Sequence, residues 1–169
     1  MKQKYARKGL VVKEATLGEK EWLFCNQDLF SEPYSIPPGL TDSEKYKVFV
    51  LKKGSELLGF HSFQIRGAGE GAYVDHLGTS IREGYEGQRL GRFLVGRVRE
   101  RIYAKGVNKG VLQAERVRSK KFWGTIGYTP IHGTPMGVEG KTLFNINFKG
   151  LKTPPRKTSW PKALGRRKR

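Results

Sequence analysis

A strand pattern that runs into a glycine-containing turn and then into an amphipathic helix constrains the fold of this 169-residue chain most strongly. Residues 72–81 read as a strand, and residues 90–104 repeat apolar side chains at helical spacing. The apolar positions of that helix are Leu90, Phe93, Leu94, Val98 and Ile102. For any one glycine of the intervening turn, residues 82–89, simple turn geometry is the alternative interpretation. Together, strand, turn and helix N-terminus predict a site where backbone N–H groups bind a phosphate.

The rest of the chain alternates between strand and helix patterns, and residues 52–55 join two of the strands as a hairpin. Further strands are predicted at 10–15, 46–51, 57–65, 110–114 and 141–148, and further helices at 16–30 and 119–125. Thr16 and Glu19 have the spacing of a capping box. On the helix 90–104, Arg92 and Arg99 are expected to face outward. This order of elements predicts an α/β or α+β domain with a mixed sheet and flanking helices.

Positive charge is concentrated in three places along the chain. The sequence has 33 Lys and Arg against 15 Asp and Glu, a net charge of +18. Residues 149–169 carry nine bases and no acid, and residues 1–8 carry four bases and no acid. Residues 82–121 have a net charge of +8, whereas residues 9–81 hold seven bases and ten acids. The charge therefore surrounds the predicted turn and fills the two ends of the sequence.

This distribution divides the chain into a basic N-terminal extension (1–9), a folded domain (10–148) and a basic, proline-containing tail (149–169). The prolines favour an extended tail. Basic side chains neutralise phosphates and an aromatic ring stacks on a base, so the tail predicts a nucleic-acid or nucleoprotein partner. The alternative is a solvated tail whose tryptophan packs on the domain. The candidate nucleic-acid-binding residues are Arg156, Lys157, Trp160, Arg166, Arg167, Lys168 and Arg169.

Several classes of protein are excluded by composition. The single cysteine, Cys25, excludes an internal disulfide framework and a multi-cysteine zinc site, and we expect it in the core of the first helix. No metal site is predicted. No apolar run reaches the roughly 18–20 residues of a membrane span, and the N-terminus lacks a signal-peptide pattern. The sequence therefore predicts an intracellular protein, either cytoplasmic or associated with a nucleoid or nucleus.

Two segments resemble the motifs of the GNAT superfamily of acyl-CoA-dependent N-acyltransferases. Residues 81–94 are similar to the family's Q/R-x-x-G-x-G/A turn, which binds the coenzyme A pyrophosphate. Residues 116–128 are similar to its N-x-x-A-x-x-F-Y-x-x-x-G-F segment, with Phe122, Gly127 and Tyr128 matching. Over residues 10–148, the resemblance implies a mixed, mostly antiparallel sheet flanked by helices, and acetyl-CoA or another acyl-CoA as cofactor. The implied cofactor-binding residues are Ile81, Glu86, Gly87, Gln88, Arg89, Leu90, Gly91, Arg92 and Phe122.

The chain departs from these motifs at chemically important positions. Glu86 stands where the family has Gln or Arg, and Arg89 stands where it has the first Gly. A carboxylate repels a pyrophosphate, and a nearby arginine such as Arg92 can compensate. Trp123 occupies the place of the Tyr that often protonates the departing thiolate, and an indole N–H is a much weaker acid.

An amine nucleophile must lose a proton, so a base is expected near the site. By its spacing from the turn, Asp75 matches the catalytic glutamate of histone-type family members. Glu115, at the end of the next predicted strand, is the other catalytic candidate. In a regular strand His76 points to the opposite face from Asp75, and a structural role is favoured for it. No pattern surrounds His61.

Two classes of function are compatible with these features. The first is an N-acetyltransferase that moves an acetyl group from acetyl-CoA to an amine on a nucleic-acid-associated substrate. The second is a non-catalytic GNAT-like subunit that binds RNA or DNA in a nucleoprotein particle. An acyltransferase acting on aminoacyl-tRNA shares the charge pattern but has no dedicated motif. The sequence leaves the acceptor and the oligomeric state open.

Overall fold

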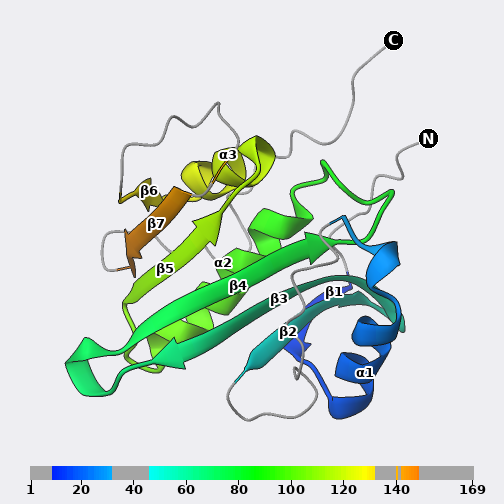
Figure 1. The fold of residues 1–169 in the computed structure, drawn as a ribbon. Helices are drawn as coiled ribbons and strands as arrows, with labels where there is room; N and C mark the ends of the chain where they lie inside the picture. The colour runs from blue at the N-terminus through cyan, green and yellow to red at the C-terminus, as the bar shows by residue number, and fades with distance from the viewer. Residues whose placement is uncertain (1–8, 32–45, 132–139, 141, 149–169) are drawn as a thin grey trace.

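In the part of the chain that the structure describes, seven strands form one sheet in the order β1-β2-β3-β4-β5-β7-β6 (Figure 1). The computed structural model describes residues 9–31, 46–131, 140 and 142–148. The strands are β1 (Leu10–Glu14), β2 (Lys47–Lys53), β3 (Glu56–Arg66), β4 (Tyr73–Ile81), β5 (Lys109–Ala114), β6 (Thr129–Pro130) and β7 (Thr142–Asn147). The helices are α1 (Leu17–Cys25), α2 (Leu90–Ala104) and α3 (Val117–Thr125), with 3-10 turns at Gln27–Leu29 and Gly69–Gly71.

The pairing of β4 with β5 differs from the other pairings among the described strands. It is parallel, whereas the others are antiparallel. It joins Val74–His76 to Gly110–Leu112 and goes no further. Immediately after it, the register of β4 against β3 shifts, which leaves Leu77 as an extra residue in β4. A bulge of this kind bends its strand, and β4 and β5 separate beyond it.

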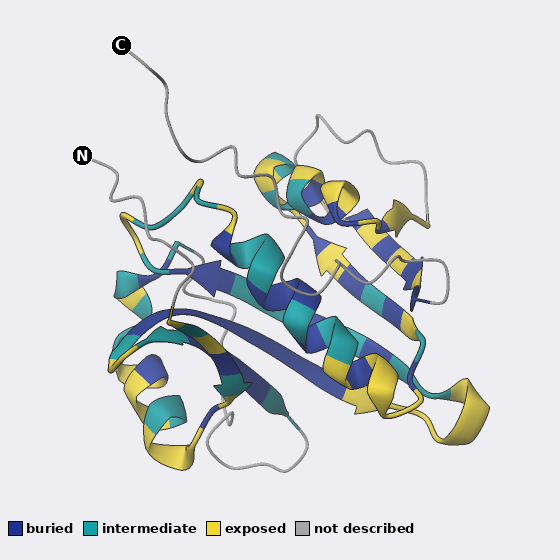
Figure 2. Ribbon diagram, turned by 180° about the vertical axis from the view of Figure 1, so that it is seen from behind, coloured by how far each residue is buried: buried dark blue, intermediate teal, exposed yellow. Residues whose placement is uncertain are grey.

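Two apolar cores lie on opposite faces of the sheet. Along β2, Val48 and Val50 face one core, while Phe49 and Leu51 face the other. Helix α1 contributes Leu23 to the first core. Helix α2 crosses the other face (Figure 2), where its predicted stripe is buried apart from the partly buried Phe93. At roughly 1.5–3 kcal/mol for each fully buried aliphatic side chain, this stripe is the main attachment of α2.

The predicted α/β class, with a mixed, mostly antiparallel sheet and flanking helices, is confirmed. Helix α2 has the predicted bounds of 90–104, the hairpin turn lies at 54–55, and helix α3 begins two residues before the predicted start at 119. The capping box is present: Glu19 N–H donates to Thr16 Oγ1 at 3.2 Å, and Thr16 N–H donates to Glu19 Oε2 at 3.0 Å. The short strand β6 was not predicted, because two residues carry no periodicity.

The prediction of one helix over 16–30 is wrong at its C-terminal end. The helix stops at Cys25, where Asn26 caps it by donating from Nδ2 to the Trp22 carbonyl at 2.7 Å. Leu23 is the buried residue of α1, and the side chain of Leu17 is 58% exposed. Cys25 is also exposed, which corrects its expected place in the core.

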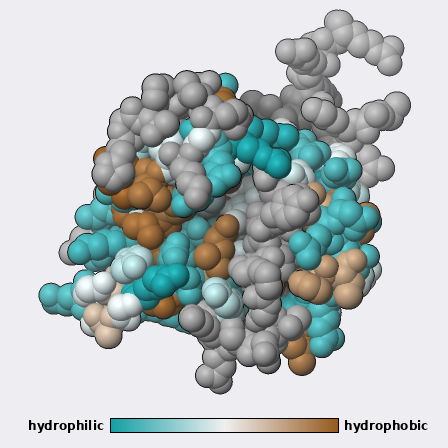
Figure 3. Space-filling model, in the orientation of Figure 1, coloured by the Kyte–Doolittle hydropathy of each residue, from teal (hydrophilic) through white to brown (hydrophobic). Residues whose placement is uncertain are grey.

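On the face shown in Figure 3, the described surface is mainly hydrophilic, with separate apolar patches. No helix in the described part of the chain is long and apolar enough to cross a membrane. Residues 1–8 of the predicted extension and the whole tail 149–169, with all seven candidate nucleic-acid-binding residues, lie outside the described residues. The division of the chain into three parts therefore remains a prediction.

Candidate functional site

The turn between β4 and α2 exposes the N-terminus of a long helix. Gly84, Gly87 and Arg89 have φ angles of 84°, 75° and 62°. Arg89 is the N-cap residue of α2, and no side chain caps this helix end. A left-handed conformation is uncommon for a residue other than glycine and marks a constrained position. The turn therefore leaves the first N–H groups of α2 available to an anion, as a phosphate site requires.

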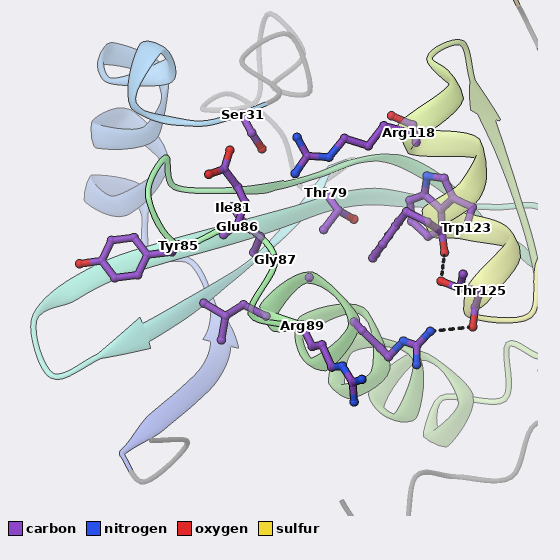
Figure 4. Close-up of a pocket in the computed structure, with 15 residues that line it drawn as sticks. Ser31, Thr79, Ile81, Tyr85, Glu86, Gly87, Arg89, Arg118, Trp123 and Thr125 are labelled. Carbon is purple, nitrogen blue, oxygen red and sulfur yellow. Dashed lines mark hydrogen bonds between the residues drawn. The ribbon is translucent and has the colours of Figure 1, made fainter. Parts of the chain in front are cut away.

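A cavity of about 400 Å³ lies beside this helix end, between the end of β4, the turn and α3 (Figure 4). We call it the turn cavity. Of the nine predicted cofactor-binding residues, eight line it and Gln88 does not. The eight are Ile81, Glu86, Gly87, Arg89, Leu90, Gly91, Arg92 and Phe122. A Cβ at position 91 would make ordinary van der Waals contact with the Phe122 ring at 3.4 Å and with Ile81 Cγ1 at 3.7 Å, so Gly91 lies close against both side chains.

Three guanidinium groups and one carboxylate line the turn cavity, so its charge favours an anion. Arg118 extends from α3 across the cavity, as Figure 4 shows. Glu86 accepts a hydrogen bond from the Gly84 N–H at 3.1 Å, which ties this carboxylate to its own turn. The arginines Arg89 and Arg92, at the start of α2, supply the compensating charge.

The outward orientation predicted for Arg92 and Arg99 is corrected by their contacts. Arg92 Nη2 donates to the Thr125 carbonyl at 3.0 Å, and Arg99 Nη1 donates to the Ile126 carbonyl at 2.7 Å. The last carbonyls of a helix have no partner within it and attract cations. These two arginines of α2 therefore hold the C-terminal end of α3 against α2.

A second cavity, of about 390 Å³, opens where β4 and β5 separate. We call it the strand cavity. It is lined by residues of both strands and of α3, and it shares Thr79, Ser119 and Trp123 with the turn cavity. The two cavities are therefore adjacent parts of one site, with these shared residues where they meet.

The two candidate bases are in different environments. Glu115 lines the strand cavity, and its carboxylate accepts from Gln113 Nε2 at 3.2 Å. Asp75 lines neither of these cavities. Its carboxylate instead accepts from Arg66 Nε at 2.9 Å and from Gln64 Nε2 at 3.3 Å. The structure thus brings Glu115, but not Asp75, to the site.

A buried hydrogen-bonded chain next to the site was missed by the sequence analysis. His61 Nδ1 lies 2.6 Å from Thr79 Oγ1, and His61 Nε2 lies 2.8 Å from His76 Nδ1. His76 Nε2 is in turn hydrogen-bonded to the Tyr128 hydroxyl. One signal was present: folding the predicted strands 57–65 and 72–81 back on each other places His61 almost opposite His76.

Burial keeps the side chains of this hydrogen-bonded chain uncharged. It lowers the pKa of His61 to about 3, with the Gly78 carbonyl opposing the shift. It also lowers the pKa of His76 well below its usual value, and the proximity of His61 and Arg99 adds to that effect. Burial raises the pKa of Tyr128. Both imidazoles and the phenol are therefore neutral at neutral pH.

No group of three or more His, Cys, Asp or Glu side chains is placed to hold a metal ion in the described parts of the chain.

No protein-family model and no curated protein sequence matches this chain. Its fold resembles that of a GNAT-family protein from Desulfovibrio desulfuricans, with a TM-score of 0.65, 14% identity, and coverage of 82% of this chain and 99% of the other. The ribosomal-protein-S18-alanine N-acetyltransferase of Escherichia coli gives a TM-score of 0.64 at 12% identity, covering 82% and 94%. A spermidine N-acetyltransferase variant from Vibrio cholerae gives 0.62 at 13% identity, covering 84% and 95%. The chain has the fold of the GNAT superfamily.

The buried histidines predict a loss of stability in mild acid. Between about pH 7.5 and pH 5, the unfolded chain binds a proton at His61 with the ordinary pKa of 6.5, while the folded chain, with a pKa of about 3, does not. We expect the free energy of unfolding to fall by about 2 kcal/mol for His61 over this range. Urea unfolding at the two pH values measures it. The decrease should be smaller in His61→Gln, and an equal decrease in that variant would contradict the assignment.

Proposed function

We propose that the protein is an acyl-CoA-dependent N-acyltransferase that moves an acetyl group from acetyl-CoA to an amine. The observation that carries this proposal is that the two cavities are adjacent and share three lining residues. One offers an uncapped helix N-terminus and three arginines, which suit a pyrophosphate. The other opens between separated strands, whose unpaired backbone groups suit the amide-containing arm of the same molecule.

The residues of the site suggest how each part of the cofactor would be held. The turn 84–91, with Arg89, Arg92 and Arg118, would bind the pyrophosphate, and the backbone of Ile81 would meet the acyl end of the arm. Acetyl-CoA supplies the activated thioester. Trp123 cannot replace the usual tyrosine as a proton donor, so positioning of the amine against the thioester would provide much of the acceleration.

Glu115 is the base that the geometry favours. It lies at the strand cavity, and its side chain is exposed enough to accept the amine proton directly or through water. Two of the similar proteins are named for amine acceptors, one an alanine of a ribosomal protein and the other spermidine. An amine acceptor for this chain is consistent with them.

Charge supports an acceptor that is attached to nucleic acid. The net charge of +18 repels a free polycation, whereas it attracts a substrate that carries phosphates. Arg116 lines the strand cavity and Arg118 lines the turn cavity, and Lys121 adds a further positive charge on α3. The second candidate function, a non-catalytic subunit that binds RNA or DNA, is favoured by Glu86 in the phosphate turn and by Trp123 in place of the usual acid.

Acetyl-CoA binding by the wild-type protein, measured by calorimetry, tests the enzyme proposal. Gly91→Glu places a carboxylate at the helix N-terminus, with its Cβ in contact with the Phe122 ring. Affinity should fall by at least about tenfold. Gly18→Glu, on α1, is the matched control because a Cβ at Gly18 meets nothing within 4 Å. Absence of wild-type binding, together with tight salt-sensitive RNA binding, would favour the non-catalytic alternative.

Glu115→Gln tests the proposed base. With a primary alkylamine such as ethanolamine, which is protonated at neutral pH, turnover should fall by roughly 100-fold. With hydroxylamine, which is largely unprotonated, the loss should be small. Thiol release from acetyl-CoA measures both. Asp75→Asn is the matched carboxylate-to-amide control. If Asp75→Asn lowers alkylamine turnover and Glu115→Gln does not, the sequence-based candidate Asp75 is the base.

Deletion of residues 149–169 tests the proposed nucleic-acid partner. The deletion removes nine bases, so affinity for RNA or DNA should fall and its salt dependence should become shallower. Fluorescence anisotropy over a series of salt concentrations measures both quantities. Turnover of ethanolamine should be retained. Unchanged nucleic-acid affinity would show that the tail does not serve this role.

A further inference from the structure

The buried hydrogen-bonded chain connects the interior of the domain to the site. It runs from Tyr128, which follows α3, through His76 on β4 and His61 on β3, to Thr79 on β4. The first three residues are 2%, 4% and 0% exposed. Thr79 lines both the turn cavity and the strand cavity. The chain is thus closed to solvent at one end and opens into the site at the other.

Hydrogen-bonding capacity gives the chain a direction. Among the described residues, His76 Nε2 is the hydrogen-bond partner of the Tyr128 hydroxyl. The phenol is protonated and its hydrogen needs an acceptor, so the hydroxyl donates to His76 Nε2. A neutral imidazole with an accepting Nε2 carries its hydrogen on Nδ1, and His76 Nδ1–H therefore donates to His61 Nε2.

A neutral imidazole donates from one nitrogen and accepts at the other, and this also fixes the direction of the hydrogen bond between His61 and Thr79. His61 accepts at Nε2, so its hydrogen is on Nδ1 and is donated to Thr79 Oγ1. Thr79 Oγ1 receives a hydrogen bond from the protein, so its own O–H hydrogen is free to donate elsewhere. The adjacent cavities are where such an acceptor can bind.

We propose that Thr79 donates this hydrogen bond to the carbonyl oxygen of the acyl thioester, and that Tyr128, His76 and His61 are positioning residues that set its direction. This inference rests on the proposed acyltransferase function. Donors held toward a carbonyl oxygen on which negative charge develops are among the strongest contributions to acyl transfer. Because position 123 is a tryptophan, the tyrosine hydroxyl of the family motif is missing there. The Thr79 hydroxyl supplies a hydrogen-bond donor on this wall of the site.

Packing around the chain holds it in one arrangement. The Trp123 ring lies against His61, His76 and Tyr128, with centroid distances of 6.3, 5.6 and 5.1 Å. Gly110 leaves space for His76, since a Cβ at that position would lie 3.2 Å from His76 Nε2. Tight packing of this kind prevents the imidazoles from flipping, which an oriented donor requires.

The direction of the chain can be tested in the protein without any ligand. Long-range ¹⁵N–¹H NMR of the histidine side chains should show both His61 and His76 as neutral Nδ1–H tautomers. In Tyr128→Phe, which keeps the ring and removes the donor, this single tautomeric state should be lost. If either histidine of the wild-type protein is an Nε2–H tautomer, the proposed direction is wrong, whatever the protein catalyses.

Turnover of acetyl-CoA with hydroxylamine tests the role of Thr79 separately from that of the base. Thr79→Val should lower kcat by about 100-fold with little change in the KM for acetyl-CoA, while Thr79→Ser should retain most of the activity. Tyr128→Phe should also lower kcat, but it should have no further effect in the Thr79→Val background, because it acts through Thr79. Additive losses would indicate a merely structural role for the buried chain.

Two further outcomes separate failure of this inference from failure of the proposed function. If wild-type protein binds acetyl-CoA and turns it over, but Thr79→Val is as active as wild type, this inference fails and the acyltransferase proposal stands. Ser119 is the other hydroxyl residue that lines both cavities. The same conclusion follows if Ser119→Ala abolishes the activity and Thr79→Val does not. If wild-type protein does not bind acetyl-CoA, the acyltransferase proposal fails. The proposed hydrogen bond from Thr79 to the thioester carbonyl then fails as well.

Discussion

The short parallel pairing of β4 with β5 is the constraint on which the rest of the structure depends. Three residue pairs hold the two strands together, and the extra residue Leu77 then separates them. Continued pairing would close the strand cavity and use the backbone groups that now face it. The separation also leaves a place where the shared residues of α3 meet β4. A small defect in strand register thus creates the site, while the antiparallel remainder of the sheet carries the stability.

Charged groups surround the site, whereas the buried hydrogen-bonded chain beside it is neutral. At the boundary, Arg92 and Arg99 bind backbone carbonyls at the end of α3 rather than carboxylates. Inside, the imidazoles and the phenol satisfy one another without any ionised group. A neutral chain of this kind keeps its orientation in the presence of a nearby phosphate, because it carries no charge for the phosphate to attract.

Much of the fold could be predicted from the sequence, because α2, its preceding turn and the β2–β3 hairpin depend on local periodicity and turn chemistry. Helix α1 was harder, since its end depends on the Asn26 cap and little of it is buried. Eight of the nine residues predicted to bind the cofactor line the turn cavity, whereas the buried hydrogen-bonded chain was not predicted. The histidine pair depends on the register between β3 and β4, and the choice between Asp75 and Glu115 depends on which strand face meets the cavity. Folding the two predicted strands back on each other only approximates the register, because the extra residue Leu77 shifts it, and the strand face that meets the cavity is not encoded in spacing along a single strand.

The contact between Arg92 and the Thr125 carbonyl gives the site an internal competition. The same guanidinium lines the turn cavity and holds the end of α3, the helix that forms one wall of that cavity. An anion at the start of α2 that contacts Arg92 would share this guanidinium with the Thr125 carbonyl. Binding of such an anion and attachment of α3 to α2 are therefore linked through Arg92. The position of α3 then depends on whether the turn cavity is occupied as well as on the fold.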